Sequence, residues 1–213
     1  NRTPDGRPMA TWTAAHWAWA KGVRMAEPAA AAALEHYVDR AEAAVEEKRA
    51  LEAKVRALAE APRWKPTVDA LRCMKGVEVV TAVALACEVD GFSRFRSASA
   101  FSAWLGVVPS ESSSGERRHR GGITKAGNKH LRWLLVEAAW HFANASRHAK
   151  PPARGQLVDP AVRRHALKGN RRLSDRRKAL DEAGKRPVVA NMAVARELAC
   201  WCWAVGRMVE SAA

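Results

Sequence analysis

Residues 34–58, LEHYVDRAEAAVEEKRALEAKVRAL, indicate a long helix because their seam residues recur at alternating steps of three and four. The seam residues are Leu34, Tyr37, Ala41, Ala44, Lys48, Leu51, Val55 and Leu58. This spacing is typical of a coiled coil. Pro28 suits the first turn of the helix, and Pro62 and Pro66 end it. The helix either packs within the chain or joins two copies, and the spacing alone leaves both open.

An aromatic-rich stretch precedes this arm. Residues 10–22 contain Trp12, His16 and Trp19 on one face of an expected short helix. Aromatic side chains dominate small cores, so we expect core packing rather than stacking on nucleic-acid bases. We assign residues 1–66 to a helical connector with a coiled-coil arm, and residues 67–213 to a second, compact helical domain.

The second domain opens with residues 67–90, TVDALRCMKGVEVVTAVALACEVD, which predict two short helices joined at Lys75-Gly76-Val77. This is the layout of a helix-hairpin-helix, whose glycine turn offers backbone N–H groups to a DNA phosphate. Glu78 stands where the usual hairpin has a second glycine, and its carboxylate would repel a phosphate. A DNA contact and a plain packing unit are both compatible with this stretch.

Further helices are expected along the rest of the chain. They cover residues 98–105 after an N-cap at Ser97, residues 129–148, a basic helix from Ser174 to Gly184, and residues 189–210. Residues 106–129 are rich in Gly and Ser, residues 149–160 are rich in Pro and Gly, and both segments are expected to be loops. No stretch reads convincingly as a strand, so we expect an all-α fold.

The charge of the chain is concentrated in its second half. The 213 residues carry a formal net charge of +14, and residues 117–213 supply all of it, with 21 Lys and Arg against 7 Asp and Glu. Such an asymmetry favours a phosphate backbone as partner, although a basic stretch can also serve solubility alone.

The composition also indicates the cellular compartment in which the protein is expected. No stretch approaches the roughly 18 apolar residues that a membrane span requires, and no signal peptide opens the chain, so we expect no membrane and no export. The four cysteines form no Cys-x-x-Cys pair and no zinc-ligand spacing. We expect a cytoplasmic protein with reduced, buried thiols and no metal in this chain.

The stretch whose residue types are best suited to catalysis is residues 109–129, PSESSSGERRHRGGITKAGNK. It places serines directly before a glycine and a dense run of cations. The cations that can grip phosphates are Arg117, Arg118, Arg120, Lys125 and Lys129, with Arg132 just beyond. A serine hydroxyl beside them can act as a nucleophile towards a phosphodiester. Loops of this composition are also common as solvated linkers.

Residues 71–142 resemble the C-terminal transposase domain of the IS110 family of insertion-sequence transposases, which are related to the Piv invertases. The resemblance rests on ordered motifs: Phe95-Arg96-Ser97, residues 103–109 (AWLGVVP), Ser113-Ser114-Gly115, residues 122–128 (GITKAGN) and residues 131–140 (LRWLLVEAAW). The tail matches through residues 184–187 (GKRP) and 193–199 (AVARELA). The heptad arm is similar to the helical connector of that family.

This resemblance implies a DNA recombinase guided by a structured bridge RNA. In that family a serine of this domain forms a covalent phosphoserine link to DNA; Ser114 matches it best, with Ser113 as second choice. The family's Mg²⁺ is held by acidic residues of an N-terminal RuvC-like domain that is absent from this chain. We therefore expect partners in DNA and guide RNA, a homo-oligomer through the arm, and little activity from the chain alone. The alternative is a non-catalytic nucleic-acid-binding and dimerisation module, or the remnant of a degraded element.

Overall fold

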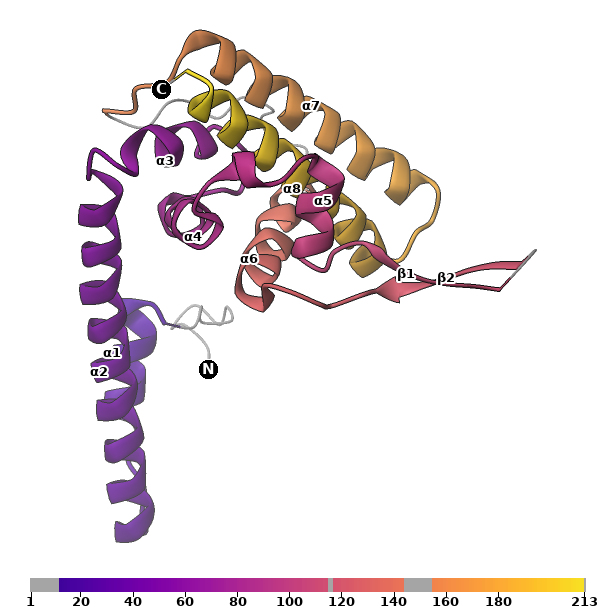
Figure 1. Ribbon diagram of the computed structural model, residues 1–213. Helices are drawn as coiled ribbons and strands as arrows, with labels where there is room; N and C mark the ends of the chain where they lie inside the picture. Colours follow the sequence, from indigo (N-terminus) through magenta and orange to yellow (C-terminus); the bar gives the residue numbers. More distant parts are fainter. Residues whose placement is uncertain (1–11, 115–116, 144–154, 213) are drawn as a thin grey trace. The chain divides into compact units, whose positions relative to one another are not determined.

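The computed structural model describes residues 12–114, 117–143 and 155–212 (Figure 1). Its contacts divide the chain into two compact units, Asn1–Lys54 and Val55–Ala213. Within the described residues there are eight α-helices, two short 3₁₀ helices and one two-stranded sheet. The predicted all-α class is therefore confirmed, with a single β-hairpin added to it. The domain boundary after residue 66 stays a prediction.

The first unit consists of helix α1 (Ala14–Gly22) and most of helix α2 (Pro28–Ala59). Pro28 begins α2, as predicted. The carboxylate of Glu27 accepts hydrogen bonds from the N–H groups of Ala29 and Ala30, at 3.0 and 2.6 Å. These bonds satisfy two donors that a helix start leaves free, and they lower the pKa of Glu27.

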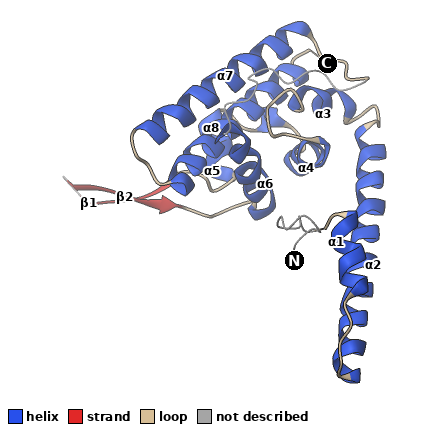
Figure 2. Cartoon of the chain, turned by 180° about the vertical axis from the view of Figure 1, so that it is seen from behind, coloured by secondary structure: helices blue, strands red, loops and turns tan. Residues whose placement is uncertain are grey.

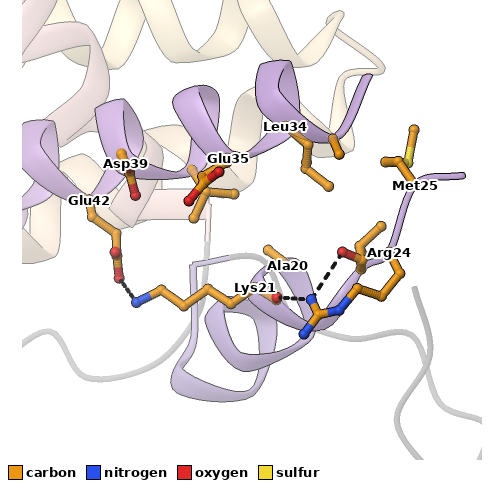
Figure 3. A pocket seen from close by; sticks show the side chains of 11 residues that line it. Ala20, Lys21, Arg24, Met25, Leu34, Glu35, Asp39 and Glu42 are labelled. Atoms are coloured by element: carbon orange, nitrogen blue, oxygen red, sulfur yellow. Dashed lines mark hydrogen bonds and ion pairs between the residues drawn. The ribbon is translucent and has the colours of Figure 1, made fainter. Parts of the chain in front are cut away.

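A cavity of about 490 Å³ lies between α1 and α2 (Figure 3). Lys21 on α1 reaches Glu42 on α2, with 2.7 Å between Nζ and Oε1. The apolar part of the lining includes Met25, Leu34 and Val38 together with smaller side chains. One exposed ion pair and a thin apolar wall therefore hold the two helices together, which is a weak contact by the usual worth of surface pairs.

This unit has no core among its described residues. No residue of α1 is buried, and none of α2 is buried before Ala59. Trp12 and Trp19 are 64% and 41% exposed, so the expectation that this aromatic face packs in a core is wrong. The rings contact each other instead, with 5.6 Å between the centroids of His16 and Trp19. Tyr37, a seam residue, is also exposed.

The second unit is a helical body arranged around helix α8 (Pro187–Glu210), as Figures 1 and 2 show. The helices that pack against α8 are α3 (Lys65–Leu71), α5 (Ala98–Trp104), α6 (Lys129–Trp140) and α7 (Pro160–Glu182). Helix α4 (Val79–Val89) packs against α3 and α6. The 3₁₀ turns η1 (Phe92–Arg94) and η2 (His141–Ala143) complete the helical elements of the described chain.

Helix α8 is long and apolar enough to cross a membrane by length and composition alone. Its apolar face is instead covered by the neighbouring helices, and Val194, Leu198, Cys202 and Val205 are fully buried there. Close packing requires a glycine on the facing helix: a Cβ at Gly169 of α7 would lie 2.7 Å from the Trp201 ring. These contacts are those of a core helix.

Ser174 does not begin a helix, contrary to the prediction. It lies in the middle of α7, which starts fourteen residues earlier at Pro160. Asp159 is the N-cap, and its carboxylate accepts from the N–H of Ala161 at 2.6 Å. Asp followed by Pro is a strong start signal, because proline at the first helical position needs no hydrogen-bond acceptor.

Residues 109–114 and 117–123 form the two paired strands of a β-hairpin where a loop was expected. Strands β1 (Pro109–Ser114) and β2 (Arg117–Ile123) pair antiparallel, and the hairpin extends away from the helical body of its unit (Figure 1). These strands could not be predicted from the sequence, because their residues lack the β-branched, alternating pattern that identifies most strands. The rest of the second unit holds this hairpin at its base.

Candidate functional site

The hairpin brings the serine-bearing strand beside the arginine-bearing strand. In the backbone register Ser114 lies opposite Arg117, and Ser113 lies opposite Arg118. Directly opposed residues of an antiparallel pair have Cα atoms about 4.5–5.5 Å apart. Both predicted nucleophiles and two of the predicted phosphate ligands therefore share one short ladder.

The side chains of residues 111–120 lie outside the described residues. This range includes Ser113 and Ser114 together with Arg117, Arg118 and Arg120, whose backbones are described as parts of β1 and β2. Arg120 lies opposite Glu111 in the ladder. Residues 115 and 116, between the strands, also lie outside the described residues.

A bulge interrupts the hairpin near its base. Pro109 pairs with Ile123 but Glu111 pairs with Arg120, so β2 has one residue more than β1 between these pairs. The hydroxyl of Ser110 donates to the carbonyl of Gly122 at 3.0 Å. A Cβ at Gly121 would lie 2.5 Å from that hydroxyl oxygen. Bulges bend a strand and raise its twist, so this one sets the direction in which the hairpin leaves the body.

Two glycines fix the base of the hairpin to the end of α5. Gly106 has φ +70° and Gly127 has φ +82°, a region that favours glycine. A Cβ at Gly106 would lie 1.8 Å from the carbonyl oxygen of Ala126, and one at Gly127 would lie 1.8 Å from that of Trp104. The N–H of Lys125 donates to the carbonyl of Gly106 at 3.1 Å. The two chain segments thus cross at a distance that only glycine permits.

Asn128 links this crossing to α6 and α4. Its side-chain oxygen accepts from the N–H of Leu131 at 2.9 Å and caps α6, while its amide nitrogen donates to Glu88 at 2.7 Å. The other oxygen of Glu88 lies 2.5 Å from Nδ1 of His130. An Asn directly before an apolar helical stretch is a recognisable cap signal, whereas no local signal points to Glu88, which lies 40 residues away along the chain.

The three predicted cations that follow strand β2, Lys125, Lys129 and Arg132, differ in exposure and in hydrogen bonding. Lys125 and Lys129 are exposed and form no ion pair with a described residue. The guanidinium of Arg132 donates to the carbonyls of Leu105 and Ala126, at 2.8 and 3.2 Å. Arg132 therefore braces the crossing under the hairpin, and phosphate contact by these three residues stays a prediction.

The turn between α3 and α4 is a packing element. A Cβ at Gly76 would lie 2.3 Å from the carbonyl oxygen of Ala138 in α6, so the turn rests directly on that helix. The N–H of Lys75 donates to the buried side chain of Asn170 at 2.8 Å. Burial also lowers the pKa of Lys75, whose ammonium lies 5.6 Å from the centre of the Phe142 ring. The turn between α3 and α4 was interpreted either as a DNA contact or as a packing unit, and its geometry favours packing.

The described residues contain no group of three or more His, Cys, Asp or Glu side chains placed to hold a metal ion.

Comparison with known proteins shows which family this part of the chain resembles. Residues 68–154 match the model of the Transposase IS116/IS110/IS902 family. This range contains the whole hairpin, the glycine crossing and α6.

Several relatives share this part of the chain. The y4qE protein of Sinorhizobium fredii, whose name describes a transposase, is 43% identical over 149 residues, which are 68% of this chain and 38% of the relative. A 43.6 kDa protein of the insertion element IS110 of Streptomyces coelicolor is 32% identical over 57% of this chain and 30% of its own length. The transposase of the element IS1111A of Coxiella burnetii is 35% identical over 32% of this chain and 19% of its own.

The chain spans well under half the length of these relatives. The ordered motifs, the family match and the named relatives agree. The chain belongs to the IS116/IS110/IS902 family of insertion-sequence transposases.

Proposed function

We propose that this chain is the serine-bearing part of a DNA transposase and that Ser114 is its nucleophile, with Ser113 as the alternative. The observation that carries the proposal is the ladder that sets Ser113 and Ser114 opposite Arg117 and Arg118. The glycine crossing, the Asn128 cap and the brace from Arg132 support it, because a firmly held base limits the positions of the strands and so lowers the entropic cost of presenting a hydroxyl to a phosphodiester.

The proposed reaction is a transesterification. The Ser114 hydroxyl gives up its proton as its oxygen forms a bond to the phosphorus of a DNA phosphodiester. The bond from that phosphorus to one sugar oxygen breaks, and the departing oxygen takes up a proton. Arg117, Arg118 and Arg120 neutralise the negative charge that builds up on the phosphoryl oxygens. The covalent serine link keeps the energy of the broken ester, so a second sugar hydroxyl can later displace the serine.

The proposal also includes the partners, the metal ion, the compartment and the oligomeric state of the complete transposase. A structured guide RNA is the second nucleic-acid partner, and Mg²⁺ is held by acidic residues of an RuvC-like domain outside this chain. The protein acts in the cytoplasm. A homo-oligomer forms through the arm, which is supported by a first unit without a described core and by the exposed seam residues Tyr37 and Leu51.

The proposal is tested on a complete transposase that carries this chain, with its guide RNA, Mg²⁺ and labelled substrate DNA. A covalent protein–DNA adduct should appear on a denaturing gel and should be lost in Ser114→Ala. Ser112→Ala is the matched control, because it removes a hydroxyl from the same strand two residues away. It should leave the adduct yield within about threefold.

An adduct of full yield in both Ser114→Ala and Ser113→Ala would remove the hairpin serines from the mechanism. Failure of the complete protein to form any adduct, combined with salt-sensitive DNA binding, would favour the non-catalytic binding module instead.

A further inference from the structure

The solvent face of α7 carries a row of exposed cations. Between Pro160 and Ser174 the helix has five Lys and Arg residues and no acidic residue. Arg164, Lys168 and Arg171 follow each other at steps of four and three, which places them on one helical face. All three are exposed, and none forms an ion pair with a described residue.

The opposite face of α7 is fixed against the body. Its buried residues are Val162, Ala166, Gly169, Asn170, Leu173 and Arg177. Because this stripe packs on the core side, the helix cannot rotate to bring the three cations inward. The three cations therefore face solvent in the folded chain, and no conformational change is needed to expose them.

The positive surface continues onto α8. Arg176 of α7 and Arg196 of α8 line one cavity of about 270 Å³. Both are exposed and neither forms an ion pair with a described residue. Glu197 also lines this cavity, but Arg172 occupies its carboxylate at 2.9 Å. The basic face is defined here as Arg164, Lys168, Arg171, Arg176 and Arg196.

Exposed charge on a helix usually serves solubility, and then both signs are mixed. Helix α2 is an example, with five Lys and Arg residues and six Asp and Glu residues. The first half of α7 differs because its charges repel one another and have no acidic neighbour on the helix until Asp175. Such an arrangement is stable in contact with a polyanion, which releases its counterions when it binds.

We propose that the basic face binds the phosphate backbone of duplex DNA and forms a second contact besides the hairpin. The inference rests on the proposed function and adds a surface to it. At 23 residues α7 is about 35 Å long, and a helix about 10–12 Å wide matches the roughly 12 Å major groove of B-form DNA. The major groove of A-form RNA is too narrow for a helix, which favours DNA.

The test compares variants of the full chain by fluorescence anisotropy with a 30-base-pair DNA duplex between 50 and 200 mM salt. The variant Arg164→Gln/Lys168→Gln/Arg171→Gln removes three charges from the basic face. If each makes one phosphate contact, the slope of log affinity against log salt falls by about 2.7. Between 50 and 200 mM salt the affinity of the parent chain for DNA should therefore fall about 40-fold more than the affinity of the variant.

Two controls separate this effect from net charge and from misfolding. Arg40→Gln/Lys54→Gln/Arg56→Gln removes the same charge from exposed positions of α2 and should leave the slope within about 0.5 of the parent value. Arg164→Lys/Arg171→Lys keeps the charge and should keep the slope. Unchanged melting temperatures would show that all variants are folded.

A parent-like slope in the α7 triple variant would overturn the inference, and so would tighter binding to duplex RNA of the same length. The variant Arg117→Gln/Arg118→Gln/Arg120→Gln, measured in parallel, separates the two sites. If only this hairpin variant loses affinity, the α7 inference fails and the proposed function stands. If only the α7 variant loses affinity, the inference stands and DNA contact by the hairpin fails. If neither loses affinity, both fail.

Discussion

Replacing Gly127 by alanine should release the hairpin from the helical body. The new Cβ would lie 1.8 Å from the carbonyl oxygen of Trp104, whereas real contacts stay above 3.0 Å, so the crossing must open by about 1.2 Å. Opening it breaks the bonds from Lys125 N–H to Gly106 and from Asn128 N–H to Trp104. Two lost hydrogen bonds cost about 2 kcal/mol, and an alanine at φ +82° costs about 1 kcal/mol more.

The expected loss of about 3 kcal/mol is measured by urea unfolding, followed through tryptophan fluorescence. Two glycines serve as matched controls. Gly184 has a similar φ of +65° but open space around its Cβ position, so Gly184→Ala isolates the conformational cost of about 1 kcal/mol. Gly122 has neither a positive φ nor a close neighbour, and Gly122→Ala should cost under about 0.5 kcal/mol. A Gly127→Ala variant no less stable than Gly184→Ala would refute the close crossing.

Three further outcomes follow from other contacts. Asn128→Ala should lower the free energy of unfolding by about 1–2 kcal/mol in urea, because it removes the α6 cap and the bond to Glu88; a loss below about 0.3 kcal/mol would contradict this. Burial, aided by the charge of Lys168, lowers the pKa of His165 below its ordinary value. The unfolded chain then binds a proton that the folded chain does not, so stability should fall from pH 7 to pH 5.5, and less so in His165→Gln; parallel pH profiles would oppose it. Burial raises the pKa of Cys202 to about 12, so a thiol reagent at pH 8 should label it only after unfolding, and rapid labelling of the folded chain would be the contrary result.

The helices were predictable where their start signals or seams are local. Ser97 caps α5, with its hydroxyl accepting from the N–H of Ala100, and Pro28 begins α2, both as expected. The start of α7 was predicted wrongly at Ser174, because serine is also a common N-cap residue, but Asp159 followed by Pro160 is the stronger start signal. A cap residue is informative only where it also interrupts the apolar periodicity, and Ser174 does not interrupt it.

The hairpin could not be predicted from local preferences. Serine, arginine and glycine are poor strand formers, and these strands are specified by their base, where Gly106 and Gly127 allow the chain segments to cross. The partner of each glycine lies about twenty residues away, and a single sequence does not reveal such a pairing. For the same reason the link from Asn128 to Glu88 was invisible, although the cap itself could be read.

The candidate site was predictable through its ordered motifs more than through its chemistry. Loops rich in Ser, Gly and Arg are common, so the residue types at 109–129 carry little weight alone. The predicted basic helix began at Ser174 and so left out Arg164, Lys168 and Arg171. Their shared exposed face became apparent only once α7 was seen to begin at Pro160 with Val162, Ala166 and Leu173 buried.

The central claim is that a hairpin serine becomes joined to DNA. The most direct measurement is mass spectrometry of the nucleotide-linked peptide, released by protease and nuclease from a complete transposase that carries this chain and has been trapped on its substrate. The account predicts a phosphonucleotide on Ser114, or on Ser113 as the alternative. A linkage mapped to any other residue, or to a serine outside β1, would contradict it.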